Sequence, residues 1–477
     1  MSLYLGVDIG TSSSKGVLVD EDGVVKRLAV REHEVDRPQP GHVEMDASVW
    51  WHEFVSLAEE LTAGTTVAAV GVSGMGPCVL VTDEAGTPLR PAILYGIDTR
   101  ATEQIDALNR ELDGILERCG SVLSTQAVGP KLAWLAEHEQ TGSRLFMPAS
   151  WLAYQLTGAY TLDYHSASQC TPLFDTHALD WYRPWAQRIA PDLELPPLAW
   201  PGDVAGHTRE PIAGIPAGTP VITGTIDAWT EAVSVGAQNP GDLMLMYGTT
   251  MFLIATVDRP LTTPAMWGTV GAFPGTRNLA GGMATSGAIT AWLRDLTGAG
   301  YEQLLAEAEA SGPGARGLLM LPYFAGERTP VMDPDARGVI AGLTLEHSRG
   351  DLYRAALEAT ALGVRHNVEA LHEAGADIRR VVAVGGGTRG GLWTRIVSDV
   401  TGLAQVVPRV TTGAAYGAAF LAAGDKDINA WNPVAETIEP NPRHSNEYDE
   451  LYALYRDLYP ATRSIAHSLA TRHRRTP

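Results

Sequence analysis

The most constraining feature of this chain is a strand–turn–strand segment that occurs twice. One copy starts at residue 4 and reads YLGVDIGTSSSKGVLV, and the other starts at residue 243 and reads LMLMYGTTMFLIA. In each copy, apolar runs typical of strands flank a short turn rich in Gly, Thr and Ser. Use of one device in both halves of a 477-residue chain indicates a duplicated domain.

The first turn carries the groups that a phosphate tail and its metal require. Asp8 ends an apolar strand, and Gly-Thr-Ser-Ser-Ser-Lys follows it. Backbone amides, hydroxyls and Lys15 are suited to phosphate oxygens, while the carboxylate of Asp8 faces the cation. The alternative for this segment alone is an ordinary Gly/Ser hairpin. No Gly-x-x-x-x-Gly-Lys-Ser/Thr loop occurs in the chain, which disfavours a P-loop fold.

The second turn, 247–251, offers amides and two threonine hydroxyls to another edge of a phosphate group. By itself this signal is weak. Paired with the first turn, it predicts two domains that close on one nucleotide.

Asp227 follows a strand predicted over 221–223 and opens a helix. One interpretation is a helix N-cap, whose carboxylate accepts hydrogen bonds from backbone amides. The other is a general base that takes the proton from an attacking sugar hydroxyl. The spacing of residues does not choose between the two.

Two further segments carry candidate sugar-binding residues. Asp98 and Arg100 lie between a predicted strand and a predicted helix, where a carboxylate and a guanidinium suit sugar hydroxyls. The alternative for them is an N-cap and a solvated arginine. Met75 lies in a Gly-rich turn after another strand and is a candidate for the same pocket.

The glycine-rich run 385–390 matches Gly-x-Gly-x-x-Gly, the dinucleotide-binding fingerprint. It follows the strand predicted over 381–384. The next predicted strand, 405–410, does not end in the acidic residue that would hold a ribose. We therefore favour a glycine turn that approaches a nucleotide in another way, and keep a dinucleotide oxidoreductase as a remote alternative.

Strand-like runs alternate with helical patterns along the chain, which is typical of α/β architecture. The domain boundary is expected near 239–241, giving domains 1–240, for sugar and phosphate binding, and 241–477, for ATP binding. Helices are expected over 43–61, 99–112, 287–296 and 351–372, further strands over 67–72 and 78–81, and a long ordered loop over 322–343.

Composition excludes several classes of function. The chain has 35 basic and 55 acidic residues, a net charge of -20 and no basic stripe, so nucleic acid is not an expected partner. No apolar run is long enough to span a membrane, and no leader segment is recognised at the N-terminus. The three cysteines are widely spaced, which favours a reducing cytoplasmic location.

Taken in order, these motifs resemble the FGGY family of carbohydrate kinases, from about residue 4 to about residue 425. The resemblance implies two ribonuclease-H-like domains of the actin and hexokinase type around a nucleotide cleft. It implies ATP and Mg²⁺ as cofactors and a small sugar as the substrate. Its most specific segments are GVDIGTSSSKGVLVD, HVEMDASVWW, LPYFAGERTPVMDPDARGVIAGLTL and GGGTRGGLWTRIVSDVTG.

The resemblance also implies residue roles. Asp227 resembles the catalytic aspartate of the family, and Asp8 the aspartate near the metal. The expected nucleotide contacts are Thr11, Ser12, Ser13, Lys15, Gly248, Thr249, Thr250, Gly287, Gly386 and Gly387. The expected sugar contacts are Met75, Asp98, Arg100 and Asp227.

Within the family, the pattern of residues 322–345 is most similar to that of the xylulokinases, which phosphorylate D-xylulose. Two positions depart from that pattern. Residues 74–77 read Gly-Met-Gly-Pro instead of Gln-Met-His-Gly, and Ala228 replaces the Asn that usually follows the catalytic aspartate. Two alternatives stay open: a kinase for another polyol, ketose or sugar acid, and a catalytically silent nucleotide-binding regulator. Many relatives form homodimers, but no sequence feature marks an interface.

Overall fold

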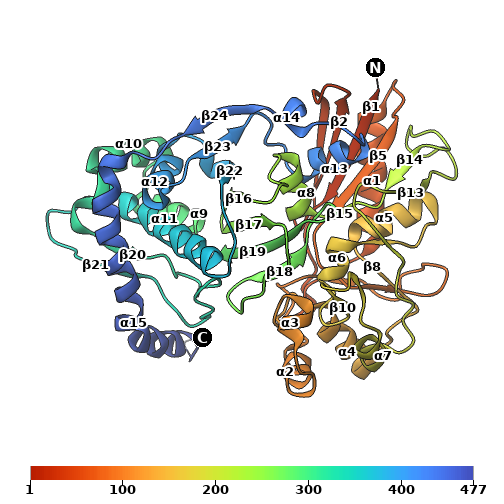
Figure 1. Cartoon of the computed structure of the whole chain (residues 1–477), viewed down its shortest axis with the longest axis horizontal. Coiled ribbons are helices and arrows are strands. Elements are labelled where there is room, and N and C mark those ends of the chain that lie inside the picture. Colours follow the sequence, from red (N-terminus) through yellow and green to blue (C-terminus); the bar gives the residue numbers. More distant parts are fainter. Residues whose placement is uncertain (1, 476–477) are drawn as a thin grey trace. The chain divides into compact units, whose positions relative to one another are not determined.

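A computed structural model describes residues 2–475 of the chain. It divides into two compact units, each a mixture of strands and helices (Figure 1). The first unit holds the chain up to Asn239 together with 258–278 and 410–433, and the second holds 240–257, 279–409 and the chain from Val434 onward. The units are therefore not two consecutive halves. The assignment of 1–240 to sugar and phosphate binding and of 241–477 to ATP binding stays a prediction.

The first unit contains most of the short elements. Its strands are β1 (Leu3–Ile9), β2 (Ser13–Asp20), β3 (Val25–Glu32), β4 (Glu44–Met45), β5 (Ala69–Gly74), β6 (Leu80–Thr82), β7 (Ala92–Ile93), β8 (Arg144–Phe146), β9 (Leu162–Asp163), β10 (Phe174–Asp175), β11 (Asp180–Trp181), β12 (Leu198–Ala199), β13 (Val204–His207), β14 (Pro220–Ile222), β15 (Thr225–Ile226) and β18 (Trp267–Val270). Its helices are α1 (Ala47–Thr62), α2 (Thr102–Glu111), α3 (Ile115–Cys119), α4 (Val128–His138), α5 (Pro148–Thr157), α6 (Tyr164–Ser168), α7 (Arg183–Ile189), α8 (Asp227–Ser234), α13 (Ala414–Ala422) and α14 (Ile428–Trp431).

The second unit contains fewer and longer helices. Its strands are β16 (Asp242–Tyr247), β17 (Met251–Val257), β19 (Arg277–Met283), β20 (Leu319–Leu321), β21 (Val339–Ala341), β22 (Arg380–Val384), β23 (Gln405–Pro408) and β24 (Val434–Ile438). Its helices are α9 (Gly287–Thr297), α10 (Tyr301–Ser311), α11 (Arg349–Glu373), α12 (Leu392–Thr401) and α15 (Ser445–Arg475), with short 3₁₀ turns η1 (Pro313–Gly317), η2 (Gly386–Thr388) and η3 (Pro442–His444).

The main sheet of the first unit runs in the order β13-β14-β5-β1-β2-β3. Strands β1, β2 and β3 form an antiparallel meander, whereas β5 and β14 join it in parallel. Strand β15 also pairs with β5. The second unit repeats the arrangement, because its own strands run in the order β19-β17-β16-β22-β23-β24, with β22 and β23 added in parallel beside β16. This shared order confirms the duplication that the paired turns predict.

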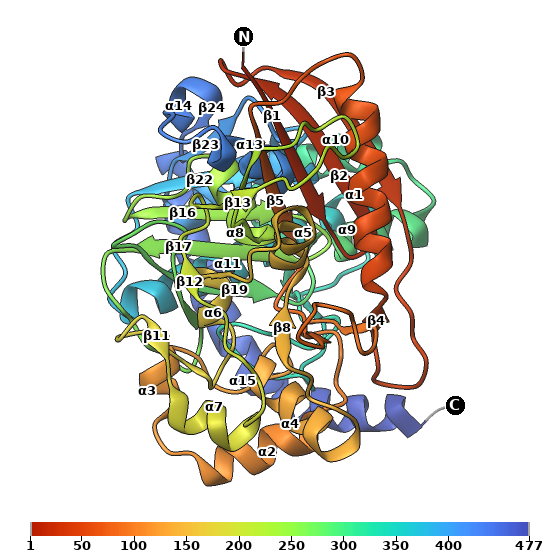
Figure 2. The same cartoon turned by 90° about the vertical axis from the view of Figure 1, so that its right-hand side faces the viewer.

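Alternation along the strands assigns the two faces of the first sheet. On β2, Leu18 joins one core cluster, whereas its neighbours Val17 and Val19 join the other. The cluster with Leu18 contains Trp50 of α1 and Trp151 of α5, so these helices cover that face; Figure 2 shows α1 lying along β2 and β3. The other face carries α13 and α8.

Two glycines let α13 approach the sheet closely. A Cβ atom added to Gly6 of β1 would lie 2.0 Å from the carbonyl oxygen of Ala415, and one added to Gly71 of β5 would lie 2.0 Å from that of Ala418. The backbone of α13 therefore rests directly on the central strands. Asp8, two residues beyond Gly6, consequently lies on the same face, where β1 ends.

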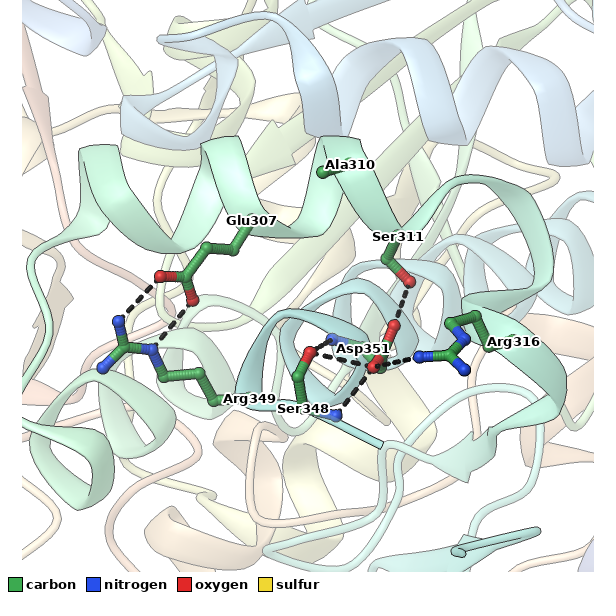
Figure 3. Close-up of a pocket in the computed structure, with 7 residues that line it drawn as sticks. All are labelled: Glu307, Ala310, Ser311, Arg316, Ser348, Arg349 and Asp351. Carbon is green, nitrogen blue, oxygen red and sulfur yellow. Dashed lines mark hydrogen bonds and ion pairs between the residues drawn. The ribbon is translucent and has the colours of Figure 1, made fainter. Parts of the chain in front are cut away.

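Helix α11 begins at a network of charged side chains (Figure 3). Ser348 and Asp351 cap each other reciprocally, and Ser311 of α10 donates a further hydrogen bond to Asp351 at 2.6 Å. Beside them, Arg349 pairs with Glu307 of α10 at 2.7 Å. These residues line a cavity of about 470 Å³. Because its carboxylates are bonded to neighbouring side chains, this network serves to fix α10 against α11.

The structure corrects two expected elements. The helix expected over 43–61 begins at Ala47, because the side chain of Asp46 caps it by accepting from the Ser48 amide at 2.8 Å, and 44–45 instead form β4. The loop expected over 322–343 contains strand β21, which pairs with β20.

Within residues 2–475, no helix has both the length and the apolar character needed to cross a membrane.

The close contact between α13 and the sheet makes a testable prediction. Gly71→Ala should lower the free energy of unfolding by about 1–3 kcal/mol, because the new methyl group meets the rigid backbone carbonyl of Ala418. Gly202→Ala is a suitable control, since its nearest neighbouring atom would be 3.7 Å away. Urea unfolding of both variants measures the difference, and equal stability would show that α13 does not constrain the strand.

Candidate active site

The ends of β1, β2 and β5 bring three polar side chains to one face of the first sheet. Asp8 of β1 lies directly opposite Lys15 on β2 and Ser73 on β5. Residues directly opposite each other on paired strands project from the same face. The register therefore places a carboxylate between an ammonium group and a hydroxyl.

Helix α8 begins beside this group. Strand β15 ends at Ile226, which pairs with Gly74 of β5, and Asp227 is the first residue of the helix. The N-cap position belongs to Ile226, so the interpretation of Asp227 as an N-cap is wrong. The carboxylate of Asp227 accepts one hydrogen bond, from the amide of Ala228 at 2.7 Å.

Hydroxyl groups join α8 to the sheet at this point. Thr230 of α8 donates its hydroxyl to the carbonyl oxygen of Ile226 at 3.0 Å, and accepts from the hydroxyl of Ser73 at 3.1 Å. Ser73 is also the cross-strand neighbour of Asp8. This chain of contacts fixes the first turn of α8 relative to the strand that carries Asp8.

A second carboxylate of α8, Glu231, was missed by the sequence reasoning. It lies four residues after Asp227 and hence on the same side of the helix. It lies against the residue that precedes α13, since a Cβ atom added to Gly413 would lie 2.6 Å from Oε2 of Glu231. Lys15 donates to the nearby carbonyl of Thr412 at 3.1 Å. Helical spacing was the signal that could have identified Glu231.

The three carboxyl groups hold protons more tightly than isolated carboxyl groups do. Burial raises the pKa of Asp8 to about 8, and the negative charge of Asp227 adds to this effect. Burial also raises the pKa of Asp227 to about 6 and that of Glu231 to about 7, while Lys15 opposes the latter shift. Of the three, Asp227 has the lowest pKa, so it is the one that is mostly ionised at neutral pH and able to accept a proton there.

One atom of this group has the properties of a metal ligand. Oδ1 of Asp8 is buried and has no hydrogen-bond partner among the residues that the structure describes. Buried carboxylate oxygens are normally satisfied, and a hard divalent cation is one partner that would satisfy this one. Asp8 therefore fits the expected role beside Mg²⁺.

The turn between β1 and β2 has the form of an anion-binding loop. Its carbonyl groups point into the protein: Ser13 accepts from the Gly10 amide at 3.0 Å, and Ser12 accepts from the His33 amide at 3.1 Å. Within residues 2–475, the amides of Thr11 and Ser12 donate to no partner. Two unpaired amides in a turn are available to a phosphate group. The Thr11 hydroxyl shares a hydrogen bond of 2.7 Å with the Tyr95 hydroxyl.

Besides Asp227, the residues expected to bind sugar are Met75, Asp98 and Arg100, and all three side chains are buried. Met75 is fully buried in the first core cluster. Asp98 accepts from the Val43 amide at 2.6 Å and from Arg100 at 2.7 Å, and Arg100 also pairs with Glu44. The side chains of Asp98 and Arg100 are 0% and 1% exposed. A sugar would need a rearrangement to reach Met75, Asp98 or Arg100, so their role stays a prediction.

The second unit gathers the residues expected to contact the nucleotide. The beginning of α9 rests on the turn between β16 and β17, because Gly287 donates its amide to the carbonyl of Gly248 at 2.9 Å. The Ser286 and Ala288 amides both donate to the carbonyl of Thr249 at 3.0 Å. A Cβ atom added to Gly287 would lie 2.5 Å from the Gly248 carbonyl oxygen. Only a glycine fits this close approach.

The glycine run that follows β22 lies beside the same turn. A Cβ atom added to Gly387 would lie 2.9 Å from that of Tyr247, whereas Gly386 has open space around it. Thr250 accepts from the Gly248 amide at 3.1 Å, through its carbonyl oxygen. The turn, the start of α9 and Gly386 thus come together where β16 and β22 end, although nothing bound there tests the expected contacts.

Comparison with family models gives matches over most of the chain. Residues 3–234 match the N-terminal domain of the FGGY family of carbohydrate kinases, and residues 243–424 match the C-terminal domain of that family.

Individual relatives agree with this result. The xylulose kinase of Escherichia coli (strain K12) is 30% identical over 95% of this chain and 96% of its own length. The glycerol kinase of Gloeobacter violaceus is 32% identical over 92% and 90%. The crystal structure of xylulose kinase from Rhodospirillum rubrum superposes with a TM-score of 0.91 at 31% identity, over 98% of this chain and 100% of that one. The two-domain α/β fold and both domain matches show that the chain belongs to the FGGY family of carbohydrate kinases.

Proposed function

We propose that this chain transfers the γ-phosphoryl group of ATP to a sugar hydroxyl, with a pentulose such as D-xylulose as the substrate and Asp227 as the general base. The observation that carries the assignment is the environment of Asp227. Its carboxylate has a raised pKa, accepts one amide hydrogen bond and lies in the same group as Asp8 and Lys15. The xylulose kinases of E. coli and R. rubrum support the choice of sugar.

The proposed reaction moves one proton and one phosphoryl group. Asp227 accepts the proton of the attacking hydroxyl, and the sugar oxygen forms a bond to the γ-phosphorus as the bond to the ADP oxygen breaks. A base with a pKa of about 6 is ionised at neutral pH and still holds a proton well enough to receive it. Asp227 later releases the proton to solvent.

Charge on the phosphoryl oxygens needs fixed positive partners. The amides of Thr11 and Ser12 and the ammonium group of Lys15 are the candidates in the first unit. Thr249 and Gly248 of the second unit remain candidates for the other phosphate contacts. Asp8 would hold Mg²⁺, which when bound supplies positive charge to the phosphate tail.

The cytoplasmic location and the homodimer also stay predictions.

One feature favours the alternative of a different acceptor. A Cβ atom added to Gly76 would lie 2.6 Å from Cγ1 of Ile226, so this position has no room for a side chain. The side chain of Ala228 likewise brings no polar group next to Asp227. A sugar bound here would find fewer hydrogen-bond partners, which suits another ketose, a polyol or a sugar acid as well as D-xylulose.

The direct test is ADP release from Mg²⁺ and ATP with a panel of acceptors. The panel contains D-xylulose, L-xylulose, D- and L-ribulose, glycerol, erythritol and gluconate, with a control lacking sugar. One acceptor should raise turnover far above the control. Asp227→Ala should abolish the increase while the affinity for ATP stays nearly unchanged. Retained turnover in this variant would refute the base assignment, and ATP binding with no active acceptor would favour the silent regulator.

The raised pKa of Asp227 predicts the pH dependence of the reaction. Because the base acts in its ionised form, kcat/KM for the sugar should fall by about tenfold per pH unit below about pH 6. Initial rates at saturating ATP and Mg²⁺ measure this limb. An acidic limb that starts near the ordinary aspartate value of 3.8 would contradict the proposed environment.

The same shift predicts an effect on stability. Folding raises the pKa of Asp227 from 3.8 to about 6, so ionisation costs stability; the cost is absent below the lower value, grows between the two and is complete above about 6. Asp227→Asn should therefore raise Tm at about pH 8 and give no gain at about pH 4. A lower Tm at about pH 8 would instead indicate that the carboxylate has a stabilising structural role.

A further inference from the structure

The turn between β1 and β2 is contacted by one residue of another segment, His33. His33, just after β3, donates its backbone amide to the carbonyl of Ser12 at 3.1 Å. Its ring nitrogen Nε2 lies 3.1 Å from the carbonyl oxygen of Gly10. A single residue thus contacts the turn at two carbonyl groups, on either side of Thr11.

The other nitrogen of the same ring contacts a carboxylate. Nδ1 of His33 lies 2.9 Å and 3.1 Å from the two carboxylate oxygens of Glu53, on α1. The side chains of His33 and Glu53 are only 7% and 14% exposed. The ring therefore lies between the carbonyl group of the turn and a carboxylate of α1, with one nitrogen toward each.

We propose that His33, oriented by Glu53, is a positioning residue of the phosphate-binding turn. The carbonyl of one residue and the amide of the next belong to one rigid trans peptide and point in opposite directions. By holding the Gly10 carbonyl, His33 therefore keeps the Thr11 amide directed at the phosphate tail of ATP, and its bond to the Ser12 carbonyl fixes the far side of the turn. Glu53 contacts Nδ1 and so fixes the orientation in which Nε2 faces the Gly10 carbonyl. This inference rests on the proposed function, because it requires the turn to bind ATP.

A neighbouring ion pair separates this role from simple packing. Arg31 of β3 pairs with Glu60 of α1 at 2.6 Å, and also bonds to Ser56 of that helix. It therefore joins the same strand to the same helix as the His33–Glu53 pair does. The contacts of Arg31 do not reach the turn, so its loss should weaken the attachment of α1 and leave the turn intact.

The test is calorimetric binding of Mg²⁺ with a non-hydrolysable ATP analogue, together with steady-state kinetics on the active acceptor. His33→Ala should raise the Kd of the analogue about tenfold, because the turn loses its brace. Glu53→Gln, which keeps the shape but removes the charge, should raise it about threefold. In both variants KM for the sugar should change by less than about twofold, since no residue of the turn is among the expected sugar contacts.

Arg31→Ala and Glu60→Gln are the matched controls, and their Kd values should equal that of the parent protein. The proposal is overturned if the His33 and Glu53 variants bind the analogue as the parent does, or if the controls weaken binding equally. If His33→Ala does not fold, Glu53→Gln decides the matter. A parent protein that neither binds the analogue nor phosphorylates an acceptor would refute the proposed function, whereas an active parent with unaffected variants refutes only this inference.

Discussion

Three carboxyl groups crowd around one ammonium group where the central strands of the first sheet end. Asp8 is placed there by the register of β1 with β2 and β5, and Asp227 and Glu231 by the first turns of α8. Lys15 is the basic residue whose charge acts on both Asp8 and Glu231. Such an excess of partly buried carboxyl groups disfavours full ionisation, which is why their pKa values rise. A folded chain keeps this arrangement only if the surrounding structure holds it in place.

The support comes from close packing of the backbone. Gly6 and Gly71 let α13 rest on β1 and β5, and Gly413, just before this helix, lies against Glu231. Thr230 and Ser73 fix α8 against β5 through hydroxyl groups. These contacts connect the fold to the chemistry, because they determine the distance between the proposed base and the strand that carries Asp8. Ionising the carboxyl groups lowers the free energy of unfolding, and the packing around them raises it.

Much of the fold and part of the site could be predicted from the sequence. The paired turns indicated two related sheets, and Asp8 and Asp227 stand at strand ends, where the local pattern marks them as candidates; for Asp227 that pattern left the choice between an N-cap and a base open. His33 and Tyr95 could not be found in this way, since they meet the turn only through folding; Tyr95 lies 84 residues from Thr11. Asp98 and Arg100 show the opposite limit. Their residue types suit a sugar, but sequence does not reveal that Val43 and Glu44 enclose them.

The central claim is that the fold raises the pKa of Asp227 so that it can act as a base. The most direct measurement is a ¹³C NMR titration of the protein labelled at the side-chain carboxyl carbon of aspartate. Asp227→Asn identifies the resonance by its absence. The account predicts that this resonance titrates with a pKa of about 6. A titration at the ordinary aspartate value of 3.8 would contradict it.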